Sequence, residues 1–216
     1  MLTNPAATTV LCFGDSNTHG APDAPGNRLA ADVRWTGQLQ RILGERYYVI
    51  EEGLNGRTID MDYPDRPGLN GRTYLTPCLL THSPLDIIVL MLGTNDTKVQ
   101  FGRSAEAIAL SWHGFLDDLF AVAFRADGSR PDVVLVSPIH IDPTQPLADM
   151  ETDSFDAASV AKAAQLSALY AAIAKERGLR FLDAAAVAAP GADSIHLTVA
   201  SHAALAELIA TEITSR

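Results

Sequence analysis

The sequence predicts an α/β protein in which helices cover both faces of a five-stranded parallel sheet, a three-layer α/β/α sandwich. Short apolar runs alternate with longer helical patterns along the chain, as in successive strand–helix–strand units. Two of these runs are apolar without interruption, which is typical of strands buried on both faces. The 216 residues contain no repeat, low-complexity tract or long linker, so we expect one domain over residues 1–216.

Five short runs are expected to form the strands of this sheet. The third and the fourth are the most apolar, with the sequences IIVLML at residues 87–92 and VVLV at residues 133–136. The expected strands are Thr9–Phe13, Tyr47–Glu51, Asp86–Leu92, Asp132–Ser137 and Leu179–Asp183.

Helical patterns fill most of the segments between and after these strands. Ser104 and Thr198 are typical N-cap residues, and Gly44 and Gly178 are typical of the position that ends a helix. Pro77 predicts a kink or a break, because proline lacks the N–H that a helix interior requires. The expected helices are Val33–Leu43, Thr73–His82, Ser104–Arg125, Ser154–Arg177 and Thr198–Ser215.

Composition excludes several classes of protein. The chain has 16 Lys and Arg against 26 Asp and Glu, a net charge of −10, and 47% hydrophobic residues, which is typical of an ordered globular protein. Without a basic run, neither a nucleic acid nor an anionic membrane is an expected partner. Residues 1–10 lack a basic residue, and no stretch approaches the roughly 20 apolar residues of a spanning helix, so we expect a soluble cytoplasmic protein.

A serine and a distant histidine are the candidates for catalysis. Ser16 follows the first expected strand, where it could act as a nucleophile; alternatively, it could cap the next helix. A serine nucleophile needs a base, and the base needs a third group that orients it. Of the six histidines, only His196 has a carboxylate three residues earlier, and Asp193 could hold its Nδ1–H while Nε2 faces Ser16.

Two further segments supply hydrogen-bond donors. GLNG at residues 53–56 follows the second strand, and GTND at residues 93–96 follows the third. Glycine lets backbone N–H groups approach a ligand, and the side chain of Asn95 could donate to an oxyanion. Both segments could instead be ordinary Gly- and Asn-rich turns. Since every candidate lies at a strand exit or before the last helix, we expect them to meet at one edge of the sheet.

These four blocks, in this order, resemble the SGNH hydrolases, also called GDSL esterases and lipases. The resemblance implies a flavodoxin-like sheet and ester or thioester hydrolysis of a small molecule, without a cofactor or a metal. It implies that Ser16 is the nucleophile, His196 the general acid/base and Asp193 its orienter. The implied oxyanion hole consists of the backbone N–H groups of Ser16 and Gly56 and the side chain of Asn95.

Residues 32–37, 51–54 and 91–98 are similar to the bacterial arylesterase/acyltransferase branch of this family. This similarity implies cleavage of short-chain and aryl esters, with acyl transfer to alcohols or peroxide in some members, and a homo-oligomer, in some members an octamer. In that branch the residues after the nucleophile are bulky and apolar, whereas this chain has Asn17, His19 and Ala21. The difference favours simple hydrolysis.

Other classes fit the sequence less well. A flavodoxin-like module that binds a nucleotide or flavin could use the glycine loops, but neither G-x-x-x-x-G-K-[ST] nor G-x-G-x-x-G occurs. The chain has no H-E-x-x-H motif, which disfavours a metal-dependent hydrolase. It also lacks, around Ser16, the G-x-S-x-G elbow of the α/β-hydrolases. A cysteine hydrolase is disfavoured because Cys12 and Cys78 lie outside the strand exits, and we expect Cys12 to be a buried thiol.

Further residues are candidates for the walls and lining of the site. The segments rich in Pro and Gly follow strand ends, where open α/β sheets bind ligands. The candidate walls are Ala21–Asn27, Asp62–Gly71 and Ile139–Glu151, and the candidate lining residues are Arg34, Trp35, Thr97, Lys98 and Phe155.

Overall fold

The computed structural model describes residues 4–144 and 154–215, and its centre is a parallel sheet with the strand order β2-β1-β3-β4-β5. This order is that of flavodoxin-like sheets, and the predicted fold class is confirmed. The strands are β1 (Thr8–Gly14), β2 (Tyr47–Gly53), β3 (Ile87–Met91), β4 (Asp132–Ser137) and β5 (Arg180–Asp183).

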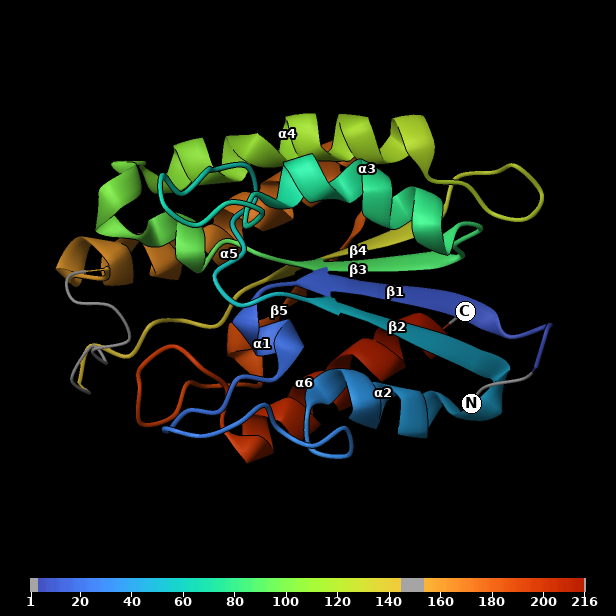
Figure 1. Cartoon of the computed structure of the whole chain (residues 1–216), viewed down its shortest axis with the longest axis horizontal. Coiled ribbons are helices and arrows are strands. Elements are labelled where there is room, and N and C mark those ends of the chain that lie inside the picture. Colours follow the sequence, from blue (N-terminus) through green and yellow to red (C-terminus); the bar gives the residue numbers. More distant parts are fainter. Residues whose placement is uncertain (1–3, 145–153, 216) are drawn as a thin grey trace.

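Helices cover both faces of the sheet (Figure 1). Helices α3, α4 and α5 lie on one face, α2 and α6 lie on the other, and the short α1 lies where β1 ends. The α-helices are α1 (Ser16–His19), α2 (Trp35–Leu43), α3 (Gly71–His82), α4 (Ala105–Val122), α5 (Ala157–Arg177) and α6 (Val199–Thr214). Short 3-10 turns are η1 (Gly44–Arg46), η2 (Asn95–Thr97), η3 (Val99–Phe101) and η4 (Ala184–Ala186).

The central strands are buried on both faces, because their alternate side chains point into two separate cores. Leu11 and Phe13 of β1 belong to the core under α3, α4 and α5, whereas Val10 and Cys12 belong to the core under α2 and α6. All five residues of β3 are buried. Both cysteines are free and buried, which confirms the expectation for Cys12.

Most predicted helix ends are confirmed by their caps. The side chains of Ser104 and Thr198 each accept a hydrogen bond from the first turn of their helices, α4 and α6. Of the two alternatives for Pro77, a kink or a break, the break is wrong, because α3 continues through this residue. Leu75, Cys78 and Leu79 are buried against the sheet, and these contacts hold the helix in place despite the missing N–H of proline.

Helix α5 corrects the expectation that no stretch approaches the length of a spanning helix. The helix has 21 residues, and an 18-residue window of it has a mean hydropathy of 1.2, so by length and composition it is long and apolar enough to cross a membrane. In this structure α5 packs on the sheet and on α4, and Leu166 and Tyr170 are among its fully buried side chains.

The strand order determines where a ligand site can form. From β1 the chain crosses to β2 at one side, and β3 then returns to the other side of β1. The crevice of an open α/β sheet lies at this reversal, outside the carboxyl ends of the two strands. Gly14 at the end of β1 pairs with Met91 at the end of β3, so the segments that follow both strands begin side by side.

Candidate active site

Ser16 lies in a tight turn at the end of β1. The carboxylate of Asp15 accepts a hydrogen bond from the backbone N–H of Asn17 at 3.0 Å, so Asp15 is the N-cap of α1 and Ser16 is its first residue. The alternative that Ser16 is the cap is therefore wrong. Within residues 4–144 and 154–215, neither the hydroxyl nor the backbone N–H of Ser16 has a hydrogen-bond partner. Both groups are available to a substrate.

Asp193 and His196 form a hydrogen-bonded pair in the turn before α6. Asp193 Oδ2 lies 2.5 Å from Nδ1 of His196, and Oδ1 accepts the backbone N–H groups of Ile195 at 3.0 Å and His196 at 2.8 Å. Ser194, at φ 74°, gives the turn the curvature that brings the carboxylate beneath the imidazole. Burial raises the pKa of Asp193, but the hydrogen bonds and charge of His196 outweigh burial and lower the pKa below its ordinary value.

The amide of Asn17 joins the serine turn to the histidine turn. Its Nδ2 donates to the carbonyl of Ile195 at 3.0 Å, and its Oδ1 accepts the N–H of Leu197 at 2.9 Å. These two bonds lie on either side of His196, far along the chain from Ser16. Asp15 faces the same histidine: burial raises the pKa of Asp15 to about 6, although the N–H of Asn17 and the charge of His196 partly offset the effect.

The second and third blocks meet at the same end of the sheet. Residues 54–57 form a turn closed by a hydrogen bond from the N–H of Arg57 to Leu54, and Gly56 has φ 82°, which favours glycine. In the described segments, the N–H of Gly56 has no hydrogen-bond partner. Asn95 Nδ2 donates to the carbonyl of Arg57 at 3.1 Å. An amide group has a second N–H, which leaves Asn95 one further donor for a ligand.

Two buried ionisable residues, Arg57 and Asp96, join these blocks. Neither of them was identified from the sequence. Arg57 donates to the carbonyl of Gly14 at 3.0 Å and to that of Glu52, so it connects the ends of β1 and β2. Asp96 accepts the N–H of Ile59 with both carboxylate oxygens at 3.1 Å, and burial raises its pKa to about 7. Asp96 belongs to the GTND block, but nothing in the sequence indicates its partner.

The candidate lining residues divide into two groups. The side chain of Arg34 pairs with both oxygens of Glu51 at 2.6 and 2.7 Å, and Trp35 is fully buried in the core under α2 and α6. Thr97 is buried, with its hydroxyl bonded to the carbonyl of Thr94. These residues hold the fold together.

Lys98 and Phe155 lie on the side of the histidine turn. The ammonium of Lys98 is 5.4 Å from the ring centre of Phe155, which packs against the cluster that contains Ile195. This places an aromatic ring near the residue that precedes His196. Of the candidate wall at Ile139–Glu151, residues 145–151 lie outside the described residues.

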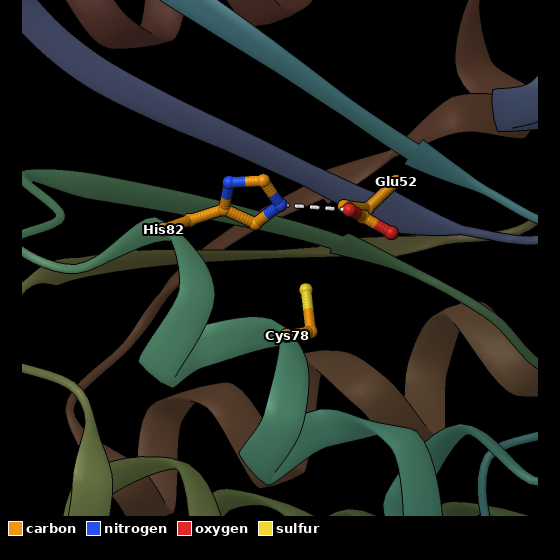
Figure 2. Close-up of side chains that lie close together, drawn as sticks. All are labelled: Glu52, Cys78 and His82. Carbon is orange, nitrogen blue, oxygen red and sulfur yellow. Dashed lines mark hydrogen bonds and ion pairs between the residues drawn. The ribbon is translucent and has the colours of Figure 1, made fainter.

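One group of side chains has metal-ligating chemistry, and the sequence search missed it. Ligand atoms of Glu52, Cys78 and His82 lie within 4.8 Å of one another, with the thiol and imidazole on successive turns of α3 (Figure 2). His82 Nε2 is already 2.8 Å from Glu52 Oε1. Burial and then the Glu52 carboxylate raise the pKa of Cys78 to about 12, and the guanidinium of Arg57 lies close enough to oppose this shift. In this structure the cluster is a hydrogen-bonded Glu52–His82 pair beside the buried thiol of Cys78.

Comparisons with known proteins identify the family and similar structures. The model of the GDSL-like lipase/acylhydrolase family matches residues 12–204. An aryl esterase from M. smegmatis is 40% identical, with 97% of this chain and 99% of that chain covered and a TM-score of 0.88. Est24, a carbohydrate acetylesterase from Sinorhizobium meliloti, is 34% identical, with 96% and 99% covered and a TM-score of 0.88.

A curated relative is much longer than this chain. The acetylxylan esterase of Xylanibacter ruminicola is 36% identical over 92 residues, which are 43% of this chain but only 18% of that protein. The family match, in contrast, includes all four blocks. The chain belongs to the GDSL-like lipase/acylhydrolase family.

Proposed function

We propose that the protein is a serine esterase that cleaves short-chain or aryl carboxylic esters through an acyl-enzyme on Ser16. The family and its aryl esterase and acetylesterase relatives support ester hydrolysis as the reaction. The observation that carries the serine mechanism is the Asp193–His196 pair, which Asn17 joins directly to the turn of Ser16.

In the first half of the reaction, Ser16 Oγ attacks the ester carbonyl carbon while Nε2 of His196 takes the hydroxyl proton. The carbonyl π electrons move to oxygen, and the backbone N–H groups of Ser16 and Gly56 and the amide of Asn95 stabilise that oxyanion. Removal of one such donor costs about 3–4 kcal/mol in a protease. When the tetrahedral species collapses, the bond to the leaving oxygen breaks, and His196 gives its proton to the departing alcohol or phenol.

In the second half, a water molecule replaces the alcohol. His196 takes a proton from water, and the resulting hydroxide attacks the acyl carbon. Collapse of the second tetrahedral species breaks the bond to Ser16 Oγ, which regains the proton from His196, and the carboxylic acid leaves. An alcohol in place of water would yield a new ester, the transfer reaction that we propose as secondary.

Ser16→Ala tests this function. The variant should lose at least about 1,000-fold in kcat on p-nitrophenyl acetate, since removal of a triad member costs about this much or more. After wild type is mixed with a slowly deacylated aryl ester, the intact protein mass should show one added acyl group, and peptide mapping should place this group on the peptide that contains Ser16. Wild-type turnover by the alanine variant, with the fold intact by circular dichroism, would exclude the proposed mechanism.

A further inference from the structure

We propose that Asn17 is a positioning residue that sets the distance between His196 and Ser16, an inference that rests on the proposed function. Asn17 is buried, with 3% of its surface exposed, and it follows the nucleophile directly in α1. Its amide uses a donor and an acceptor at once, toward the residues on either side of His196. A carboxamide can do both, whereas an aliphatic side chain can do neither.

The hydrogen bonds of the histidine turn show why such a link is needed. Asp193 binds Nδ1 of His196 and two backbone N–H groups of the same turn, so it orients the imidazole relative to the turn itself. Other backbone bonds join the turn to Gly191 and to Asp142 in the segment after β4. None of these contacts relates His196 to Ser16.

Asn17 makes that connection. Across the described residues, its two bonds are the only hydrogen bonds between α1 and residues 193–197. The loss of both bonds would leave the Asp193–His196 pair intact but free to move away from Ser16. A displacement of about 1 Å between a catalytic group and its target can cost roughly 100-fold in rate. The role of Asn17 is therefore separable from that of Asp193.

Three variants test this inference, with p-nitrophenyl acetate as substrate. Asn17→Leu removes both bonds, and kcat should fall about 10–100-fold while KM changes less than about twofold. Asn17→Ala removes both bonds with a smaller side chain, and its kcat should fall as in Asn17→Leu. Thr18→Val is the matched control: Thr18 is the next residue of α1, fully buried, and its hydroxyl lacks a hydrogen-bond partner in the described segments. Its kcat should be unchanged.

Two further measurements separate positioning from a merely stabilising role. The rate at which a sulfonyl fluoride labels Ser16 reports the activation of the nucleophile, and it should fall in parallel with kcat in Asn17→Leu. The low-field proton resonance of the Nδ1–H of His196, a signature of its bond to Asp193, should persist in the same variant. A general loosening of the turn would remove this resonance together with the activity.

Each outcome decides the inference. Wild-type kcat and labelling in Asn17→Leu would overturn it, and so would a loss of activity that tracks the unfolded fraction or the loss of the low-field resonance. If Asn17→Leu does not fold, Asn17→Ala carries the test, since wild-type kcat in a folded Asn17→Ala also overturns the inference. Failure of the proposed function itself is distinguishable, because Ser16→Ala would then retain activity.

Discussion

Asp193 divides its two carboxylate oxygens between two tasks. Oδ1 accepts two backbone N–H groups and shapes the turn, while Oδ2 holds Nδ1 of His196. An asparagine at this position could keep the first task with its carbonyl oxygen, but it would place an NH₂ group opposite Nδ1. The imidazole would then accept at Nδ1 and carry its proton on Nε2, where a base for Ser16 must be unprotonated.

Asp193→Asn should therefore lower kcat by about 100- to 10,000-fold with little change in melting temperature. Initial rates on p-nitrophenyl acetate and a thermal melt measure both effects. Asp127→Asn, a change at an exposed carboxylate in a distant loop, serves as the control and should be neutral. An Asp193→Asn variant with full activity would mean that His196 needs no orienting carboxylate.

At the scale of elements, β2 supports the nucleophile through a glycine. Gly53 pairs with Gly14 at the ends of β2 and β1, and α1 lies directly against it. A Cβ on Gly53 would lie 2.1 Å from the backbone N of His19 and 2.5 Å from the carbonyl carbon of Thr18. Backbone atoms cannot rotate away as a side-chain tip can, so α1 and Ser16 would have to shift.

Gly53→Ala is thus expected to reduce kcat by about 10–100-fold through displacement of Ser16, and to destabilise the protein by about 1–3 kcal/mol. Urea unfolding and esterase rates measure the two effects. Gly26→Ala is the matched glycine control, because its Cβ would meet no atom closer than 3.6 Å. Equal behaviour of the two variants would show that α1 does not depend on close contact with β2.

The elements also show which parts of the fold can be predicted from the sequence. Strands β3 and β4 are continuous apolar runs, and Ser104 and Thr198 have local capping partners, so short windows predict them. The three-residue spacing of Asp193 and His196 predicts their contact for the same reason. The sequence around Asn17 shows only a departure from a bulky apolar pattern, because the partners of its amide lie at the other end of the chain.

Arg57 and Asp96 were missed for a related reason. Their partners are backbone groups of other segments, and a backbone N–H or carbonyl leaves no mark in the sequence. The cluster of Glu52, Cys78 and His82 depends on how α3 packs beside β2, although the i, i+4 spacing of Cys78 and His82 was a usable signal. Contacts that tertiary packing creates thus escape a reading of local patterns.

For the molecule as a whole, two buried groups make stability depend on pH in opposite directions. Burial raises the pKa of Asp96 to about 7, so the unfolded state ionises first and stability falls as pH rises from about 4 to 7. Burial, and then the charge of His196, lower the pKa of His202 to about 4. The unfolded state takes up that proton first, and stability falls as pH drops from about 6.5 to 4. The shifts correspond to free energies on the order of 4 kcal/mol for Asp96 and 3 kcal/mol for His202.

The hydrogen bonds of the two residues agree with these signs. Nδ1 of His202 accepts the backbone N–H of Trp35 at 3.1 Å, so protonation at that nitrogen would break the bond. Asp96 is fully buried, and its nearest cation, Arg103, is 3.7 Å away and pairs more closely with Asp60 at 2.7 Å. A neutral amide in each position can keep an acceptor without a titrating proton.

Asp96→Asn and His202→Gln should therefore change the pH dependence of the unfolding free energy with opposite signs. Relative to wild type, Asp96→Asn should gain stability as pH rises from 4.5 to 8, and His202→Gln should gain as pH falls from 7 to 4.5. Urea unfolding across this range measures the differences, in which titrations common to all variants cancel. His140→Gln, at an exposed histidine, should follow wild type. Slopes of the same sign for both variants would mean that burial does not govern these two groups, and parallel curves would mean that neither titrates in this range.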